Sequence, residues 1–141
     1  MKLLNDRSVE YVVIGASAFP THGYSRSTLD IDIFIRPTIE NAKATLQSLQ
    51  EFGYDTEDLT AQDLLENKVL IRQYMVETDI HPFVAGTTFD EVNEGKVYEN
   101  IEGIRVAVAG LDELIKMKKA ANRPKDQEDL KFLEQIKKTK K

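Results

Sequence analysis

The chain has 141 residues, of which 41% are hydrophobic and 30% charged, so we expect residues 1–141 to form a single domain around one core. Its lack of cysteine excludes a disulfide framework and a thiolate metal site. No apolar run approaches the roughly 18 residues of a membrane span and no signal-peptide core is present, which predicts a cytoplasmic protein without a membrane partner. A net charge of −5 argues against broad, nonspecific nucleic-acid binding, because such binding needs many cations.

The first candidate site follows an apolar run that ends at a glycine. Residues 9–14 predict a strand that is buried on both faces. Gly15, Ala16 and Ser17 follow, and we expect a turn into a helix that starts near Pro20 or is kinked by it. The free N–H groups of a helix N-terminus can bind a phosphate. The alternative is that Gly15 only permits a tight turn.

The next apolar run, residues 28–35, carries two carboxylates two residues apart. Side chains alternate in a strand, so Asp30 and Asp32 share one face, about 7 Å apart. Two such acids can share a pair of divalent cations that lie roughly 3.5–4 Å apart, and oxygen ligands favour Mg2+. The alternative is a strand end whose acids face water. Arg26, in the preceding polar loop, can clamp a triphosphate or neutralise the two acids.

The middle of the chain alternates helical and extended patterns. Thr38 is a helix N-cap before a core-facing helix that ends at Gly53, and Thr60 begins a second, short helix. Residues 69–75 and 76–80 are extended, as a hairpin or one bent strand. After a short helix over residues 88–94, residues 97–101 are expected to pair with residues 104–108 in a hairpin.

Lys118 lies on the inward face of the next predicted helix, because it follows Leu111 by seven residues and Leu114 by four. An inward lysine needs an anion, which can be a nucleotide phosphate or a carboxylate; otherwise the side chain extends past the core to solvent. Asp126 and Asp129 fall in the first turn of the last helix. We expect them to pair with Arg123 or Lys118 rather than to act directly in catalysis.

The order Gly15-x-Ser17, then Asp30-x-Asp32, resembles the nucleotidyltransferase superfamily typified by DNA polymerase beta. The chain is similar to the small nucleotidyltransferases that are often associated with toxin–antitoxin systems. That similarity includes His22-Gly23 and Arg26-x-Thr28, and it continues through residues 114–130, so it spans most of the chain. One departure is Ala16, where such proteins usually have glycine or serine. Either Ser17 supplies the hydroxyl, or the pocket is modified.

The resemblance implies an α/β fold, in which helices pack against a mixed β-sheet. It also implies a third carboxylate on a strand beside the Asp-x-Asp strand. Asp79 occupies that position, and Glu77 is the fallback candidate on the same face. Asp79 would help to bind the metal and act as general base toward an attacking hydroxyl. We interpret His22 and His81 as structural.

The expected function is transfer of a nucleoside monophosphate from a Mg2+-bound nucleoside triphosphate, with two ions in the site. The acceptor hydroxyl would belong to a protein, an RNA 3′ end or a small molecule, and a partner protein or homo-oligomer would complete the assembly. The alternative is a non-catalytic binding, antitoxin or regulatory subunit with the same fold; a third possibility is a cation site without nucleotide chemistry. The expected catalytic and metal-binding residues are Asp30, Asp32 and Asp79, and the expected nucleotide-binding residues are Gly15, Ala16, Ser17, Arg26 and Lys118.

Overall fold

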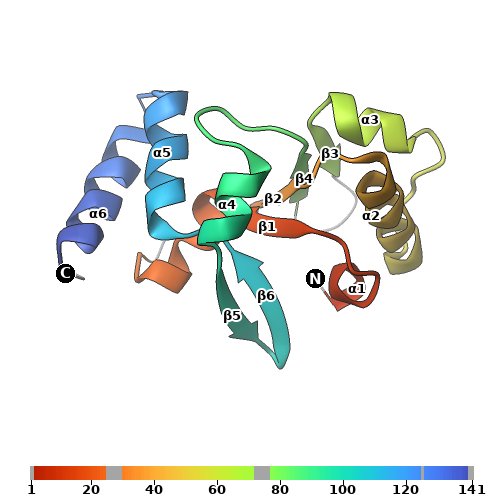
Figure 1. Ribbon diagram of the computed structural model, residues 1–141, viewed down its shortest axis with the longest axis horizontal. Helices are drawn as coiled ribbons and strands as arrows, with labels where there is room; N and C mark the ends of the chain where they lie inside the picture. Colours follow the sequence, from red (N-terminus) through yellow and green to blue (C-terminus); the bar gives the residue numbers. More distant parts are fainter. Residues whose placement is uncertain (1, 25–29, 72–76, 125, 140–141) are drawn as a thin grey trace.

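Six strands pair into one sheet within residues 2–24, 30–71, 77–124 and 126–139, the part of the chain that the computed structural model describes (Figure 1). The order across the sheet is β3-β4-β2-β1-β6-β5. β1 runs parallel to β6 and β2 runs parallel to β4, whereas the other neighbours are antiparallel. The predicted mixed sheet is therefore confirmed. The strands are β1 (Tyr11–Ile14), β2 (Asp30–Ile35), β3 (Val69–Ile71), β4 (Glu77–His81), β5 (Val97–Ile101) and β6 (Ile104–Val108).

Two pairs of α-helices lie toward opposite ends of the sheet, and α4 lies between them near β1 (Figure 1). α5 and α6 pack against each other at one end, and α2 and α3 do so at the other. The β5–β6 hairpin extends away from the rest of the sheet (Figure 1). The helices are α1 (Lys2–Asp6), α2 (Ile39–Phe52), α3 (Ala61–Glu66), α4 (Phe89–Gly95), α5 (Leu111–Ala121) and α6 (Asp126–Thr139).

The two faces of β2 carry different chemistry. Ile31, Ile33 and Ile35 face α2, where they line an apolar cavity of about 290 Å3 together with Leu49 and other side chains. Asp32 points to the opposite face, as period 2 requires. All four residues of β1 are buried, which confirms a strand covered on both faces. The sheet thus buries its isoleucines on one side and presents Asp32 on the other.

The chain after β1 departs from the prediction. In place of one helix that begins near Pro20 or is kinked by it, the structure has two short 3-10 helices, η1 (Gly15–Ala18) and η2 (Pro20–His22). Pro20 is at the start of η2, where its missing N–H and its fixed φ are tolerated. It also separates η2 from η1. The predicted α-helix is therefore wrong, and the segment closes as tight turns beside β2.

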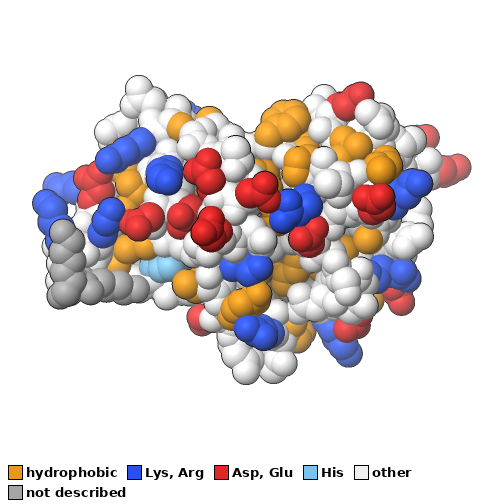
Figure 2. Space-filling model, in the orientation of Figure 1, with side chains coloured by type: hydrophobic (Ala, Val, Ile, Leu, Met, Phe, Trp, Pro, Cys, Tyr) orange, Lys and Arg blue, Asp and Glu red, His pale blue; other side chains and the backbone are white. Residues whose placement is uncertain are grey.

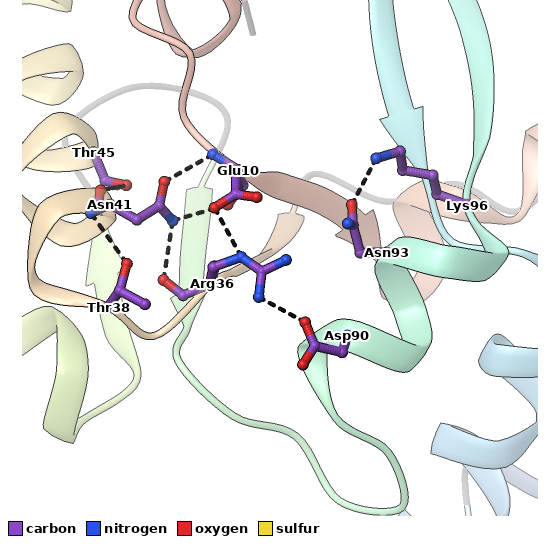
Figure 3. Close-up of polar contacts among 8 residues, drawn as sticks. All are labelled: Glu10, Arg36, Thr38, Asn41, Thr45, Asp90, Asn93 and Lys96. Carbon is purple, nitrogen blue, oxygen red and sulfur yellow. Dashed lines mark hydrogen bonds and ion pairs between the residues drawn. The ribbon is translucent and has the colours of Figure 1, made fainter.

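Asn41 ties the start of α2 to the ends of β1 and β2 (Figure 3). Its side chain accepts from the Glu10 N–H at 2.8 Å and donates to the carbonyls of Glu10 and Arg36 at 2.9 and 3.0 Å. Thr38 caps the helix by accepting from the Asn41 N–H, as its position predicted. Arg36 in turn pairs with Glu10 at 2.8 Å and with Asp90 of α4 at 2.6 Å (Figure 3). These contacts fix β2, which carries the candidate site.

β5 and β6 form the expected hairpin. Of the two alternatives for residues 69–80, a hairpin or one bent strand, the structure has two antiparallel strands, β3 and β4. β4 is thereby held between β3 and the parallel β2, so its side chains are fixed from both sides. Among the described residues, none of the helices is both long and apolar enough to cross a bilayer.

Candidate functional site

Asp32 and Asp79 lie directly opposite each other on the parallel strands β2 and β4. Two residues beyond Asp79 on the same face, the His81 Nε2 atom lies 2.9 Å from Asp32 Oδ1. Asp79 is buried, and the Asp32 and His81 side chains are 25% and 16% exposed. One ligating atom from each of the three residues can be chosen so that all lie within 4.8 Å of one another. The structure thus concentrates three metal-ligand groups where two strands meet.

The turn after β1 contacts these acids from the neighbouring strand. Gly15 has a φ of +66°, and a Cβ atom on it would lie only 2.7 Å from Asp32 Oδ2. Glycine is required here both by backbone conformation and by space. The Ser17 hydroxyl donates to the Ile14 carbonyl at 2.9 Å and accepts from the Asp32 N–H at 3.4 Å. Ser17 therefore connects the turn to β2.

A cavity of about 590 Å3 opens in front of the three metal-ligand groups. Its floor includes Gly15 and Ala16, and its opposite wall comes from α5 and α6, where Lys118 and Asp126 line it. Apolar side chains complete the lining at Ile14, Phe83, Val84, Ala85, Leu114, Met117 and Ala121. This volume falls within the range of about 300–1,000 Å3 that is usual for small-molecule sites.

The far wall of the cavity is a compensated ion cluster. Lys118 Nζ lies 2.9 Å from Asp126 Oδ1 and 3.4 Å from Asp129 Oδ2, and its side chain is only 13% exposed. Arg123 Nε donates to Asp126 Oδ2 at 2.8 Å, and the Tyr24 hydroxyl donates to Asp129 at 2.9 Å. The predicted pairing of the two α6 acids with Lys118 and Arg123 is confirmed.

The electrostatics of this cluster favour a charged Asp126. Burial acts to raise the pKa of its carboxyl, but hydrogen bonds from Arg123 and Lys118 outweigh burial and hold the pKa well below its usual range. The same hydrogen bond raises the pKa of Arg123. Figure 2 shows acidic and basic side chains interspersed on the surface around α4, α5 and α6. Ion pairs in this region join Lys116 to Glu91 of α4 and Lys119 to Glu134 of α6.

Five of the predicted site residues line this cavity together: Gly15, Ala16, Asp32, Asp79 and Lys118. Asp30 lies in β2 two residues before Asp32, with its backbone in register with Glu77; its side chain is outside the described part of the chain. Arg26 lies outside the described residues. Asp79, rather than the fallback Glu77, is the β4 acid opposite Asp32.

Two titratable residues of the cavity lining, His81 and Lys68, were not predicted to belong to the site. His81 was interpreted as structural, although period 2 places it on the face of Asp79 and was a signal available in the sequence. Lys68 Nζ lies 3.9 Å from Asp79 Oδ2, and its place depends on how β3 pairs with β4, which no local pattern specifies. His22 is buried and its Nε2 atom lies 2.8 Å from the Ala109 carbonyl, consistent with its structural interpretation.

The donor set fits a divalent cation. Asp32 and Asp79 offer carboxylate oxygens, His81 offers a ring nitrogen, and their ligating atoms are close enough to converge on one ion. Carboxylates are the ligands that Mg2+ prefers, and the cavity gives an ion and a phosphate access to them.

The mixed sheet, with acids paired across β2 and β4 beside a glycine turn, is a nucleotidyltransferase fold. The chain belongs to the family described as nucleotidyltransferase of unknown function (DUF6036), whose sequence model matches residues 1–139. No match was found among curated proteins.

Two solved structures share the fold. TM1012 from Thermotoga maritima, described as a nucleotidyltransferase, superimposes with a TM-score of 0.64 at 18% identity, covering 95% of this chain and 88% of that chain. The lincosamide antibiotic adenylyltransferase LnuA, in its lincomycin-bound structure, superimposes with a TM-score of 0.62 at 16% identity, covering 96% of this chain and 92% of that chain. At these identities the likeness concerns the fold.

Proposed function

We propose that the chain transfers a nucleoside monophosphate from a Mg2+-bound nucleoside triphosphate to an acceptor hydroxyl. The observation that carries the proposal is the pair Asp32 and Asp79, opposite each other on parallel strands at the base of a cavity of about 590 Å3. Family membership supports the reaction class. The acceptor candidates are a protein, an RNA 3′ end and a small molecule.

In this mechanism, Asp79 accepts the proton of the acceptor hydroxyl as its oxygen forms a bond to the α-phosphorus. The bond between that phosphorus and the β-phosphate oxygen breaks, and pyrophosphate leaves. Asp30, Asp32 and Asp79 would hold the divalent cations, which would neutralise charge on the phosphate oxygens. The protein's part is mainly positioning.

The phosphate contacts come from both walls of the cavity. Gly15, Ala16 and Ser17 would contact the triphosphate from the β1 turn, with Arg26 from the loop that follows. Lys118 would contact it from α5, where its ammonium already lies at the cavity wall. Because Asp126 and Asp129 hold Lys118 in place, they act as positioning residues.

One observation favours the non-catalytic alternative, in which the chain binds a partner as an antitoxin or regulatory subunit. Ala16 lines the cavity, where a methyl group takes space close to the proposed phosphate position. Participation in a toxin–antitoxin system, and completion by a partner protein or a second copy, remain predictions.

The test is a thermal-shift titration of the wild type and Asp32→Asn with each nucleoside triphosphate, with and without Mg2+. A ligand at one hundred times its dissociation constant stabilises the native state by about 2.7 kcal/mol, which is readily measured. We expect one triphosphate to stabilise the wild type only with Mg2+, and Asp32→Asn not to respond. The matched control is Asp112→Asn, a surface acid of α5 that pairs with Lys137 and should respond like the wild type.

Binding is then followed by a transfer assay that measures pyrophosphate release in the presence of candidate acceptors. Mg2+-dependent nucleotide binding without release would favour the non-catalytic alternative. No stabilisation by any triphosphate would contradict nucleotide binding by this chain.

A further inference from the structure

His81 is a cavity residue whose ring is aimed at a carboxylate rather than at the protein backbone. Its Nε2 atom lies 2.9 Å from Asp32 Oδ1, and its side chain is 16% exposed on the cavity wall. His22, the other histidine of the chain, instead has its Nε2 atom 2.8 Å from the buried Ala109 carbonyl. A backbone carbonyl fixes a ring in the core, whereas a carboxylate partner is itself a metal ligand.

We propose that His81 is a metal ligand together with Asp32 and Asp79, and that this mixed nitrogen–oxygen site binds Mn2+ in preference to Mg2+. This inference names the cation that the proposed reaction would use. Binding of the cation does not depend on the proposed function, whereas its use in nucleotidyl transfer does.

The distances between the three side chains are compatible with one shared ion. Two neighbouring ligands of an octahedral ion, each about 2.1 Å from it, are about 3.0 Å apart, and opposite ligands are about 4.2 Å apart. The observed 2.9 Å between His81 Nε2 and Asp32 Oδ1 corresponds to a neighbouring pair. All three ligating atoms lie within 4.8 Å of one another, which is only slightly more than the distance of about 4.2 Å between opposite ligands. Small side-chain rotations would therefore bring the three atoms onto one ion.

The three side chains also come from two paired strands. Asp79 and His81 share a face of β4, and β4 pairs in parallel with β2, which carries Asp32. All three side chains thus project from paired strands, and such positions hold ligands more accurately than a loop does. A β3 partner on the other side of β4 restrains the strand further.

The combination of nitrogen and oxygen donors favours Mn2+ over Mg2+. Mg2+ is a hard ion that prefers oxygen donors and retains its water, whereas imidazole nitrogen suits transition metals. Mn2+ accepts carboxylates as Mg2+ does and also lies on the series of ions that bind nitrogen. A site with two carboxylates and one imidazole should therefore discriminate in favour of Mn2+.

The test uses the whole chain and metal ions alone, without nucleotide. Calorimetric titrations with Mn2+ and Mg2+ give the affinity ratio, and pulsed electron paramagnetic resonance of the Mn2+-loaded protein detects 14N coupling from a bound imidazole. In the wild type we expect tighter Mn2+ binding and a 14N signal. In His81→Gln, which retains a hydrogen-bond donor toward Asp32, we expect the Mn2+ preference to fall about tenfold and the 14N signal to vanish.

The matched control is His22→Gln, which removes the other imidazole and should keep the 14N signal once circular dichroism shows that it is folded. Absence of Mn2+ binding or of 14N coupling in the wild type would overturn the proposal. So would persistence of the signal in His81→Gln, or an unchanged Mn2+ preference there. Because no triphosphate is present, these results are independent of whether the nucleotide titration above succeeds.

Discussion

Two pairs of aspartates lie on opposite walls of one cavity, and their surroundings differ. On α6, Asp126 and Asp129 are held by Lys118, whose Nζ atom lies 2.9 and 3.4 Å from their oxygens. On the sheet, Asp32 contacts a histidine, and Asp79 has Lys68 at 3.9 Å, the margin of an ion pair. Among the contacts described, the helix acids meet the lysine and arginine of one ion cluster, whereas the strand acids meet the His81 ring and the half-exposed Lys68.

We propose that this difference separates acids that stabilise the fold from acids that act in the proposed reaction. Two nearby carboxylates repel each other, and burial without a counter-ion raises the free energy of the charged form. The α6 pair is neutralised by the protein and stabilises the fold. The strand pair lines the cavity beside His81, where its carboxylates are accessible to a cation. The comparison therefore predicts that substitutions on the two walls affect different measured quantities.

Asp79→Asn tests the strand wall, and the largest effect is expected here. Loss of a general base and metal ligand should lower the rate of nucleotidyl transfer by about 10^3-fold. Asparagine keeps the shape of the side chain, and the ion pair lost is with the half-exposed Lys68, so the free energy of unfolding should change less than in a variant of the buried helix acids. Initial rates of pyrophosphate release and urea unfolding measure the two quantities. A variant that unfolds more easily yet transfers at the wild-type rate would reverse the proposed assignment.

Asp126→Asn tests the helix wall, and its main effect should be on stability. Asp126 is 1% exposed and bonded to both Lys118 and Arg123, so loss of its charge leaves a buried lysine with a weaker partner. We expect the free energy of unfolding to fall by about 3 kcal/mol, as is usual when one partner of a buried ion pair is removed. Urea unfolding at pH 7 provides the measurement.

The same variant should also change the pH dependence of stability. The folded-state pKa of Asp126 is lowered, so its contribution is fully present above the unfolded-state pKa of about 4 and is lost as pH falls further, through the folded value. Wild-type stability should therefore decline below about pH 4 more steeply than that of Asp126→Asn. Parallel curves for the two proteins would show that Asp126 is not the carboxyl responsible.

Local patterns predicted most elements correctly, since caps and turns act over a few residues. Thr38 and Thr60 cap their helices by accepting from the N–H three residues on, as expected. The turn at Glu102 and Gly103, both with positive φ, closes the predicted hairpin. The helix after Gly15 was predicted wrongly because the prolines and glycines that permit a helix start also permit 3-10 turns.

The site was predictable only where periodicity or the family resemblance applied. Period 2 predicts the face on which Asp32 lies, whereas the side chain of Asp30 is outside the described part of the chain. Asp79 was assigned through the resemblance, because strand order is a property of the whole sheet. His81 could have been assigned to the face of Asp79 from the same periodicity. Lys68 could not be predicted, since it reaches Asp79 through the pairing of β3 with β4.

Gly15→Ala tests the turn that lies beside Asp32. It should lower the free energy of unfolding by about 1–2 kcal/mol, less than Asp126→Asn does, because alanine is strained at a φ of +66°. Its Cβ atom would also lie 2.7 Å from Asp32 Oδ2, so the carboxylate must move and cation affinity should fall. Gly23→Ala is the matched control: its φ is +93°, yet its Cβ atom would meet nothing within 4 Å. Both variants should lose stability in chemical denaturation, but only Gly15→Ala should weaken Mn2+ binding. Equal loss of Mn2+ affinity in both would mean that general destabilisation, rather than displacement of Asp32, controls the site.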